Sequence, residues 1–147
     1  MIPETYVTDN FEIIKQPSKT YKMEIEKERI SIEKIDKLHA YNQMIYKCLN
    51  TEKGIYSIYP NFGIKKRDLF GKPKDLAFIK LTRRIEDALL LDDRTIKVYN
   101  FEYLADLSTE DRLGMKFTVE SMFGVSEIKE VLEINGIWKI VWKRNLW

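Results

Sequence analysis

The acidic-acidic-arginine run Asp92-Asp93-Arg94 holds the residue types most able to do chemistry in this chain. Two carboxyl groups about 5 to 9 Å apart can hydrolyse a glycosidic bond, and an arginine has five fixed donors that can clamp carboxylates or carbonyls of another chain. Asp92 and Asp93 are consecutive, however, so their side chains diverge in a helix and in a strand. A salt bridge or a capping network with Arg94 therefore explains the run better than catalysis does.

One histidine and one cysteine set the remaining chemical limits. Any Ser-His or Cys-His catalyst would need His39, but it falls inside an expected helix, where a surface position accounts for it. Cys48 lies beside Leu49 at the end of that helix and is expected to be a small buried hydrophobe, because a reactive thiolate needs basic neighbours. One cysteine cannot form a disulfide within the chain, and one cysteine with one histidine are too few ligands for a Cys/His metal site. The sequence predicts no catalytic residue, no cofactor and no metal.

Composition and motifs exclude several classes of protein. The chain contains no P-loop, dinucleotide fingerprint, nucleophile elbow or zinc-protease pair. Its 147 residues suit one domain, and its 25 basic and 23 acidic residues are interspersed, so nothing points to a nucleic acid or a membrane surface. No apolar run reaches the roughly 20 residues of a bilayer span, and the first ten residues lack a signal-peptide pattern. We expect a soluble protein of a reducing cytoplasm.

Hydrophobic periodicity places Asp92-Asp93-Arg94 between a helix and a strand. Apolar residues recur every three or four positions from about Asp75 to the acidic pair, and residues 96–103 are rich in β-branched and aromatic side chains. A first helix is expected over Asp36–Leu49, with Asp36 as N-cap. Residues 20–26 and 30–32 alternate on either side of a charged turn, which predicts a hairpin.

The second half of the chain predicts antiparallel strands. Residues 115–119 alternate clearly and are expected to pair with 96–103, leaving 104–114 as a polar connection. Residues 125–134 fit a short helix or a strand, and we favour the strand. Asn135-Gly136 then predicts a C-terminal hairpin. Residues 55–59 are β-prone and, being rich in aromatics, are expected to pack against the body.

The predicted fold is therefore α+β, a single domain with two main helices packed on a mostly antiparallel sheet and a C-terminal β-hairpin. Residues 1–19 form an N-terminal arm and 20–147 the domain. In the terminal strand, Trp138 and Trp142 share one face with Ile140 between them. Two interpretations stay open: these side chains cover the domain's own core, or the strand pairs with a strand of a partner and the aromatics anchor that interface.

Ordered blocks of residues also carry a resemblance to a known family. They are Pro17-Ser18-Lys19-Thr20-Tyr21, Asn42-Gln43 through Leu49-Asn50-Thr51, and Tyr59-Pro60-Asn61-Phe62-Gly63. With them the chain resembles the baseplate wedge proteins, or sheath initiators, of contractile phage tails and phage tail-like bacteriocins, and in particular the prophage branch of Gram-positive bacteria. That family carries Glu-Pro-Arg at the end of its second helix. Here Asp92-Asp93-Arg94 keeps the arginine, shortens the acid by one methylene and lacks the proline.

The resemblance implies a non-catalytic building block of the baseplate, assembled in the bacterial cytoplasm, with six copies per ring. Its implied partners are other wedge proteins, the sheath protein and tube or hub proteins. Carried onto this chain, Asp92, Asp93 and Arg94 become candidate wedge contacts. The implied residues for strand pairing with sheath are Ile137, Trp138, Ile140 and Trp142.

Two other classes of function stay open at this stage. Older naming of the family attaches the word lysozyme, so a peptidoglycan hydrolase that depends on a carboxylate such as Asp92 or Glu86 is one alternative. A generic adaptor of another complex is the other.

Overall fold

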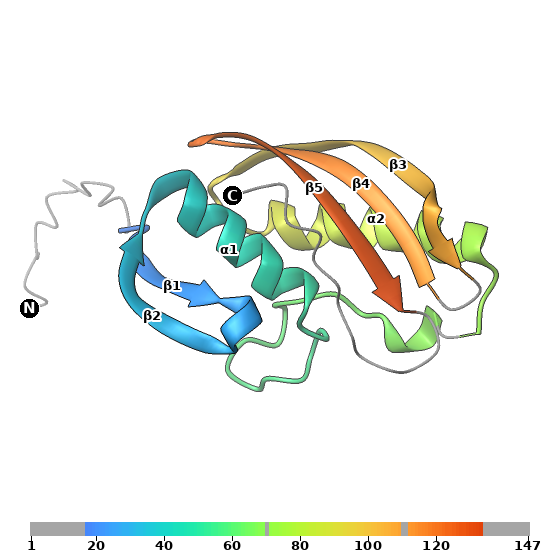
Figure 1. Cartoon of the computed structure of the whole chain (residues 1–147). Coiled ribbons are helices and arrows are strands. Elements are labelled where there is room, and N and C mark those ends of the chain that lie inside the picture. Colours follow the sequence, from blue (N-terminus) through green and yellow to red (C-terminus); the bar gives the residue numbers. More distant parts are fainter. Residues whose placement is uncertain (1–16, 70, 110–111, 134–147) are drawn as a thin grey trace, which may run out of the picture.

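The computed structural model describes residues 17–69, 71–109 and 112–133. It confirms the α+β prediction: two helices accompany two antiparallel sheets in one domain (Figure 1). The elements in chain order are β1 (Thr20–Glu24), a 3-10 turn (Ile25–Lys27), β2 (Arg29–Ile35), α1 (Lys37–Leu49), a 3-10 turn (Arg67–Leu69), α2 (Lys74–Leu90), β3 (Thr95–Thr109), β4 (Arg112–Ser121) and β5 (Gly124–Glu133).

Local signals set the first half of the fold. β1 and β2 form the expected antiparallel hairpin, and α1 starts where the Asp36 carboxylate accepts a hydrogen bond from the Lys37 N–H, 2.7 Å away. The buried side chain of Gln43 ties the two together, because its amide nitrogen donates to the carbonyl of Tyr21 and its oxygen accepts from the N–H of Met23. The backbone of the hairpin is thus hydrogen-bonded to a side chain of α1.

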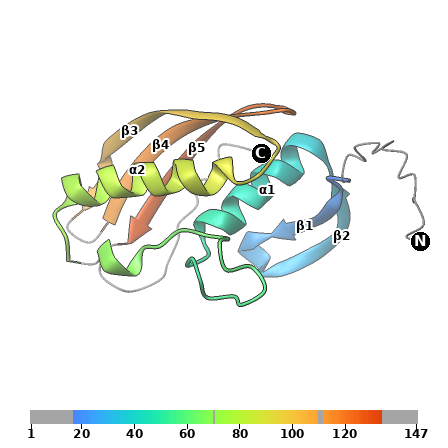
Figure 2. The same cartoon turned by 180° about the vertical axis from the view of Figure 1, so that it is seen from behind.

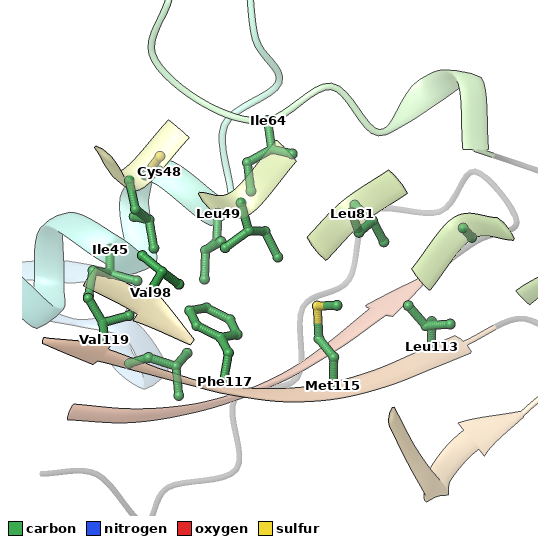
Figure 3. Close-up of a cluster of buried hydrophobic side chains, with 14 of the residues drawn as sticks. Ile45, Cys48, Leu49, Ile64, Leu81, Val98, Leu113, Met115, Phe117 and Val119 are labelled. Atoms are coloured by element: carbon green, nitrogen blue, oxygen red, sulfur yellow. The ribbon is translucent and has the colours of Figure 1, made fainter. Parts of the chain in front are cut away.

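The three-stranded sheet carries both helices on one face. Its order is β3-β4-β5, all antiparallel, with β4 in the centre; Figure 2 shows α2 lying across this sheet. Alternate residues of β4 are fully buried and meet the apolar faces of α1 and α2 (Figure 3). Those β4 residues are Leu113, Met115, Phe117 and Val119. The opposite face of the sheet is polar, as expected for an antiparallel sheet covered on one side.

The prediction that 104–114 is a polar connection is wrong. β3 continues to Thr109, and Leu104 pairs with Gly114 in β4. Polar side chains do not stop a strand whose backbone groups find partners on its neighbour. Here the Ser108 hydroxyl also donates to the Leu104 carbonyl and accepts the N–H of Gly114.

The prediction that 55–59 is strand-like and packs is also wrong. These residues form turns, and only an isolated bridge joins Glu52 to Ile64 nearby. Their four large side chains are more than half exposed. The strand over 125–134, in contrast, is confirmed as β5. β4 and β5 form a hairpin, whereas the predicted hairpin at Asn135-Gly136 and most of the arm over 1–19 lie outside the described residues.

Candidate functional site

Asp92-Asp93-Arg94 forms a tight corner between α2 and β3. The Thr95 N–H donates to the carbonyl of Asp92 at 3.1 Å, which closes a turn directly after the helix. Arg94 then clamps the Asp92 carboxylate three times: its backbone N–H and Nε donate to Oδ1 at 2.9 and 2.8 Å, and a terminal nitrogen donates to Oδ2 at 2.7 Å. The salt bridge predicted within the run is confirmed, and Asp93 is left exposed.

The corner is braced from two other elements. The Arg94 guanidinium lies 5.6 Å from the ring centre of Tyr41, a fully buried residue of α1. The Tyr41 hydroxyl hydrogen-bonds the hydroxyl of Thr95 at 2.5 Å. The turn between β4 and β5 contributes as well, because the Met122 N–H donates to the Arg94 carbonyl at 3.0 Å. Three parts of the chain therefore hold this turn in one shape.

The electrostatics keep the corner ionised at neutral pH. Burial raises the pKa of the Asp92 carboxyl, but the hydrogen bonds from the Arg94 side chain and backbone outweigh it, so the pKa lies below its usual range. The hydrogen bond to Asp92 also raises the pKa of Arg94. A carboxyl held in this state is poorly suited to act as a general acid.

Exposed apolar residues flank the ion pair in the sequence, and Met122 is hydrogen-bonded to Arg94 through its backbone. Leu91 is 65% exposed and Ile96 is 60% exposed, on either side of the three charged residues. We call the set the corner surface; its members are Leu90, Leu91, Asp93, Ile96 and Met122. The helical periodicity of α2 places Leu89 in the core and does not require Leu90 or Leu91 to be buried. These two leucines are therefore the sequence signal for this surface.

A second ion pair lies in the interior and was not predicted. Lys66 and Glu130 are both buried, with 3.9 Å between Lys66 Nζ and Glu130 Oε1. Lys66 Nζ also donates to the carbonyl of Leu49, whereas neither carboxylate oxygen of Glu130 has a hydrogen-bond partner. Burial raises the pKa of Glu130 to about 7 against the opposing effect of Lys66.

The described residues offer little for catalysis. Burial raises the pKa of the Glu130 carboxyl, but Glu130 is enclosed in the core, where it is not accessible as a general acid. Cys48 is buried, as predicted, and burial raises the pKa of its thiol. His39 is on the exposed side of α1, also as predicted.

Residues 17–69, 71–109 and 112–133 contain no cluster of three side chains that could ligate a metal. None of the helices described is long and apolar enough to cross a membrane.

Comparison with known proteins shows the family of this chain. Residues 19–124 match the family model of contractile injection system sheath initiators. The chain belongs to the sheath initiator family. It is 36% identical over 121 residues to the phage-like element PBSX protein XkdS of Bacillus subtilis (strain 168), an alignment that covers 80% of this chain and 84% of that protein.

Family membership confirms the resemblance to prophage sheath initiators. It gives the chain a structural role at the baseplate and sheath of a contractile particle, in contact with other tail or sheath components. The residues expected to pair with sheath, Ile137, Trp138, Ile140 and Trp142, lie outside the described part.

Proposed function

We propose that this sheath initiator joins the baseplate wedge through its corner surface. The observation that carries the proposal is an ion pair satisfied within the chain and flanked by exposed apolar residues. Because Asp92 and Arg94 satisfy each other, a partner need not supply a countercharge, and the corner keeps its shape before binding. Leu91 and Ile96 supply apolar area to bury, and the exposed Asp93 is suited to the polar rim.

A matched pair of substitutions tests this assignment. Leu91 and Ile79 are each 65% exposed, but Ile79 lies on α2, more than two turns before the corner. We expect Leu91→Ser to reduce incorporation into wedges assembled from co-expressed baseplate proteins about tenfold or more, because an interface anchor is lost. Ile79→Ser should assemble normally. Equal incorporation of the two variants, both folded by circular dichroism, would contradict the role of the corner.

We further propose that the segment 137–142 gives the first sheath ring a strand to extend. β5 is the edge of the sheet within the described residues, where it pairs only with β4. An edge strand presents unpaired N–H and C=O groups that a partner strand can use. In the segment that follows, the sequence spacing of Trp138, Ile140 and Trp142 would place them on one face if the segment forms a strand, and there they would be suited to anchor that pairing.

Removing one donor tests the strand role. Ile140→Pro abolishes a backbone N–H that a paired strand would need, and Ile140→Val is its control. We expect the proline variant to enter wedges normally but to start few sheaths, counted by electron microscopy of assembled particles. Normal sheath numbers would show that 137–142 is not the template.

The proposal also extends to copy number, place of assembly and chemistry. Six chains per ring would follow from the symmetry of the wedge, and native mass spectrometry of isolated baseplates counts them; assembly is expected in the bacterial cytoplasm. Tube or hub proteins are further candidate partners.

A purified chain that cleared peptidoglycan at enzymatic rates, with loss of clearing in Asp92→Asn or Glu86→Gln, would contradict the purely structural role.

A further inference from the structure

A second apolar surface lies in the loop between α1 and α2. Four of the five residues from 55 to 59 are large and apolar, and each is more than half exposed. Their exposed fractions are Ile55 56%, Tyr56 58%, Ile58 83% and Tyr59 67%. Single exposed apolar residues are normal on a protein surface, but a contiguous group marks an interaction site. We call these four residues the loop tip.

The loop that carries the tip has a fixed base. The Ile64 N–H donates to the Thr51 carbonyl at 2.9 Å, and the Lys53 N–H donates to the Ile64 carbonyl at 3.3 Å. Ile64 is 1% exposed and its side chain extends toward Leu49 in the core (Figure 3). The tip is thus presented on an anchored frame, which lowers the entropy lost when a partner binds.

Gly63 makes this base possible. It has a φ of 101°, and a Cβ there would lie 2.3 Å from the carbonyl oxygen of Thr51. Only glycine allows the two ends of the loop to approach this closely. The glycine at position 63 therefore allows the closed base on which the exposed tip is carried.

The segment that carries the tip is basic. Between residues 47 and 72 the chain has six basic and two acidic residues. Both acidic side chains are already used: Glu52 accepts the backbone N–H of Lys66, and Asp68 pairs with Arg84 at 2.7 Å. Three exposed cations make no ion pair within the described residues; they are Lys53, Lys65 and Arg67.

We propose that the loop tip inserts into an apolar groove rimmed by carboxylates on another protein of the contractile particle. Apolar area supplies the affinity, and the cations at the base of the loop select a groove of opposite charge. The choice of a particle protein as partner rests on the proposed function. The site itself is distinct from the corner surface, because the loop and the α2–β3 turn lie toward opposite ends of α1 (Figures 1 and 2).

Photo-crosslinking locates the occupant. The photoreactive residue p-benzoylphenylalanine replaces Tyr59 in one full-length chain and Leu91 in another, and each is assembled with the co-expressed baseplate and sheath proteins. We expect the two positions to crosslink to different protein segments, the Tyr59 position to one rich in apolar and acidic residues. Crosslinks from Leu91 alone would overturn the loop proposal and leave the corner intact. Absence of particle crosslinks from both positions would overturn both proposals.

Affinity measurements on the crosslinked protein then test the chemistry. We expect Ile58→Ser/Tyr59→Ser to weaken binding about tenfold or more, whereas Ile32→Ser, at a position 93% exposed on β2, should bind normally. Lys53→Gln/Lys65→Gln should weaken binding about threefold and flatten its dependence on salt.

Other occupants give different results, each of which would overturn the proposal. A crosslink from Tyr59 to residues 1–16 of its own chain would make the loop an internal contact, and one to a second copy would make it a self-association surface. Co-sedimentation with vesicles of anionic lipid, lost in Ile58→Ser/Tyr59→Ser, would make it a membrane-binding loop.

Discussion

The ion pair at the corner, Asp92–Arg94, and the ion pair in the core, Lys66–Glu130, are built in opposite ways. At the corner, Asp92 and Arg94 are partly solvated, and the carboxylate accepts three hydrogen bonds from Arg94. In the core, Glu130 is fully enclosed, and its oxygens accept none. The first pair is stable in charge over the physiological range, whereas the second can change its charge near neutral pH.

The corner pair therefore bears on the shape of a surface, whereas the buried pair bears on the stability of the fold. The corner keeps its ion pair charged near neutral pH, because the pKa of Asp92 is lowered and that of Arg94 is raised. The Lys66–Glu130 pair instead links the residue before the 3-10 turn, the end of α1 and β5, so its protonation acts where these three segments pack together. Substitutions that break one ion pair at a time should distinguish their effects on stability, and the buried pair should have the larger effect.

Breaking the buried pair should have the largest effect. Lys66→Met keeps much of the side-chain volume but leaves Glu130 without its cation, so we expect a loss of about 3 to 5 kcal/mol in the free energy of unfolding at pH 8. The loss should be smaller at pH 5, where Glu130 is protonated. Denaturant unfolding measures both, with Lys65→Met at the exposed neighbouring position as control. An equal loss at the two pH values would contradict the pairing.

The charge of Glu130 should also make stability depend on pH. The pKa of Glu130 is raised from 4.5 to about 7 in the folded chain, so between these values the folded state binds more protons than the unfolded state. Stability from this group is therefore present at low pH and is lost as pH rises through this window, by about 2 kcal/mol between pH 5 and 8. Glu130→Gln should remove that slope in urea titrations, and a variant that kept it would assign the slope to another group.

Breaking the corner pair should cost less. Arg94→Ala removes the clamp on Asp92 and the contact with the Tyr41 ring, and we expect a loss of about 1 to 2 kcal/mol without unfolding. Thermal unfolding measures this loss. Asp93→Ala, at the exposed neighbour, should change stability by no more than about 0.5 kcal/mol. An unfolded Arg94→Ala protein would show that Arg94 supports the core and does not only shape the corner.

The features found from sequence are those that depend on local order along the chain. Periodicity gave both helices and the alternation of β4, and the salt bridge of Asp92 with Arg94 was predicted because only one residue separates them. The bracing by Tyr41 could not be predicted in this way, because α1 must first pack beside the α2–β3 turn. The same holds for Lys66 and Glu130, which are brought together only when β5 joins the sheet.

Predictions from residue type alone were wrong where contacts with other segments decide the structure. Aromatic and β-branched residues at 55–59 predict packing, yet the chain supplies nothing among the described residues to cover them. The polar stretch after Leu104 predicts a loop, yet β4 satisfies its backbone. In the first case the missing information is the partner, and in the second it is the neighbouring strand.

The polar face of the β3–β4–β5 sheet limits how the sheet can grow. Lys116 lies there between Glu102 at 3.1 Å and Glu127 at 3.7 Å, with all three side chains reaching solvent. A second sheet stacked on this face would have to dehydrate that row of charges, which is costly. A strand added along an edge would leave the row in water. The row therefore acts as a directional constraint, permitting lateral extension of the sheet while opposing face-to-face stacking.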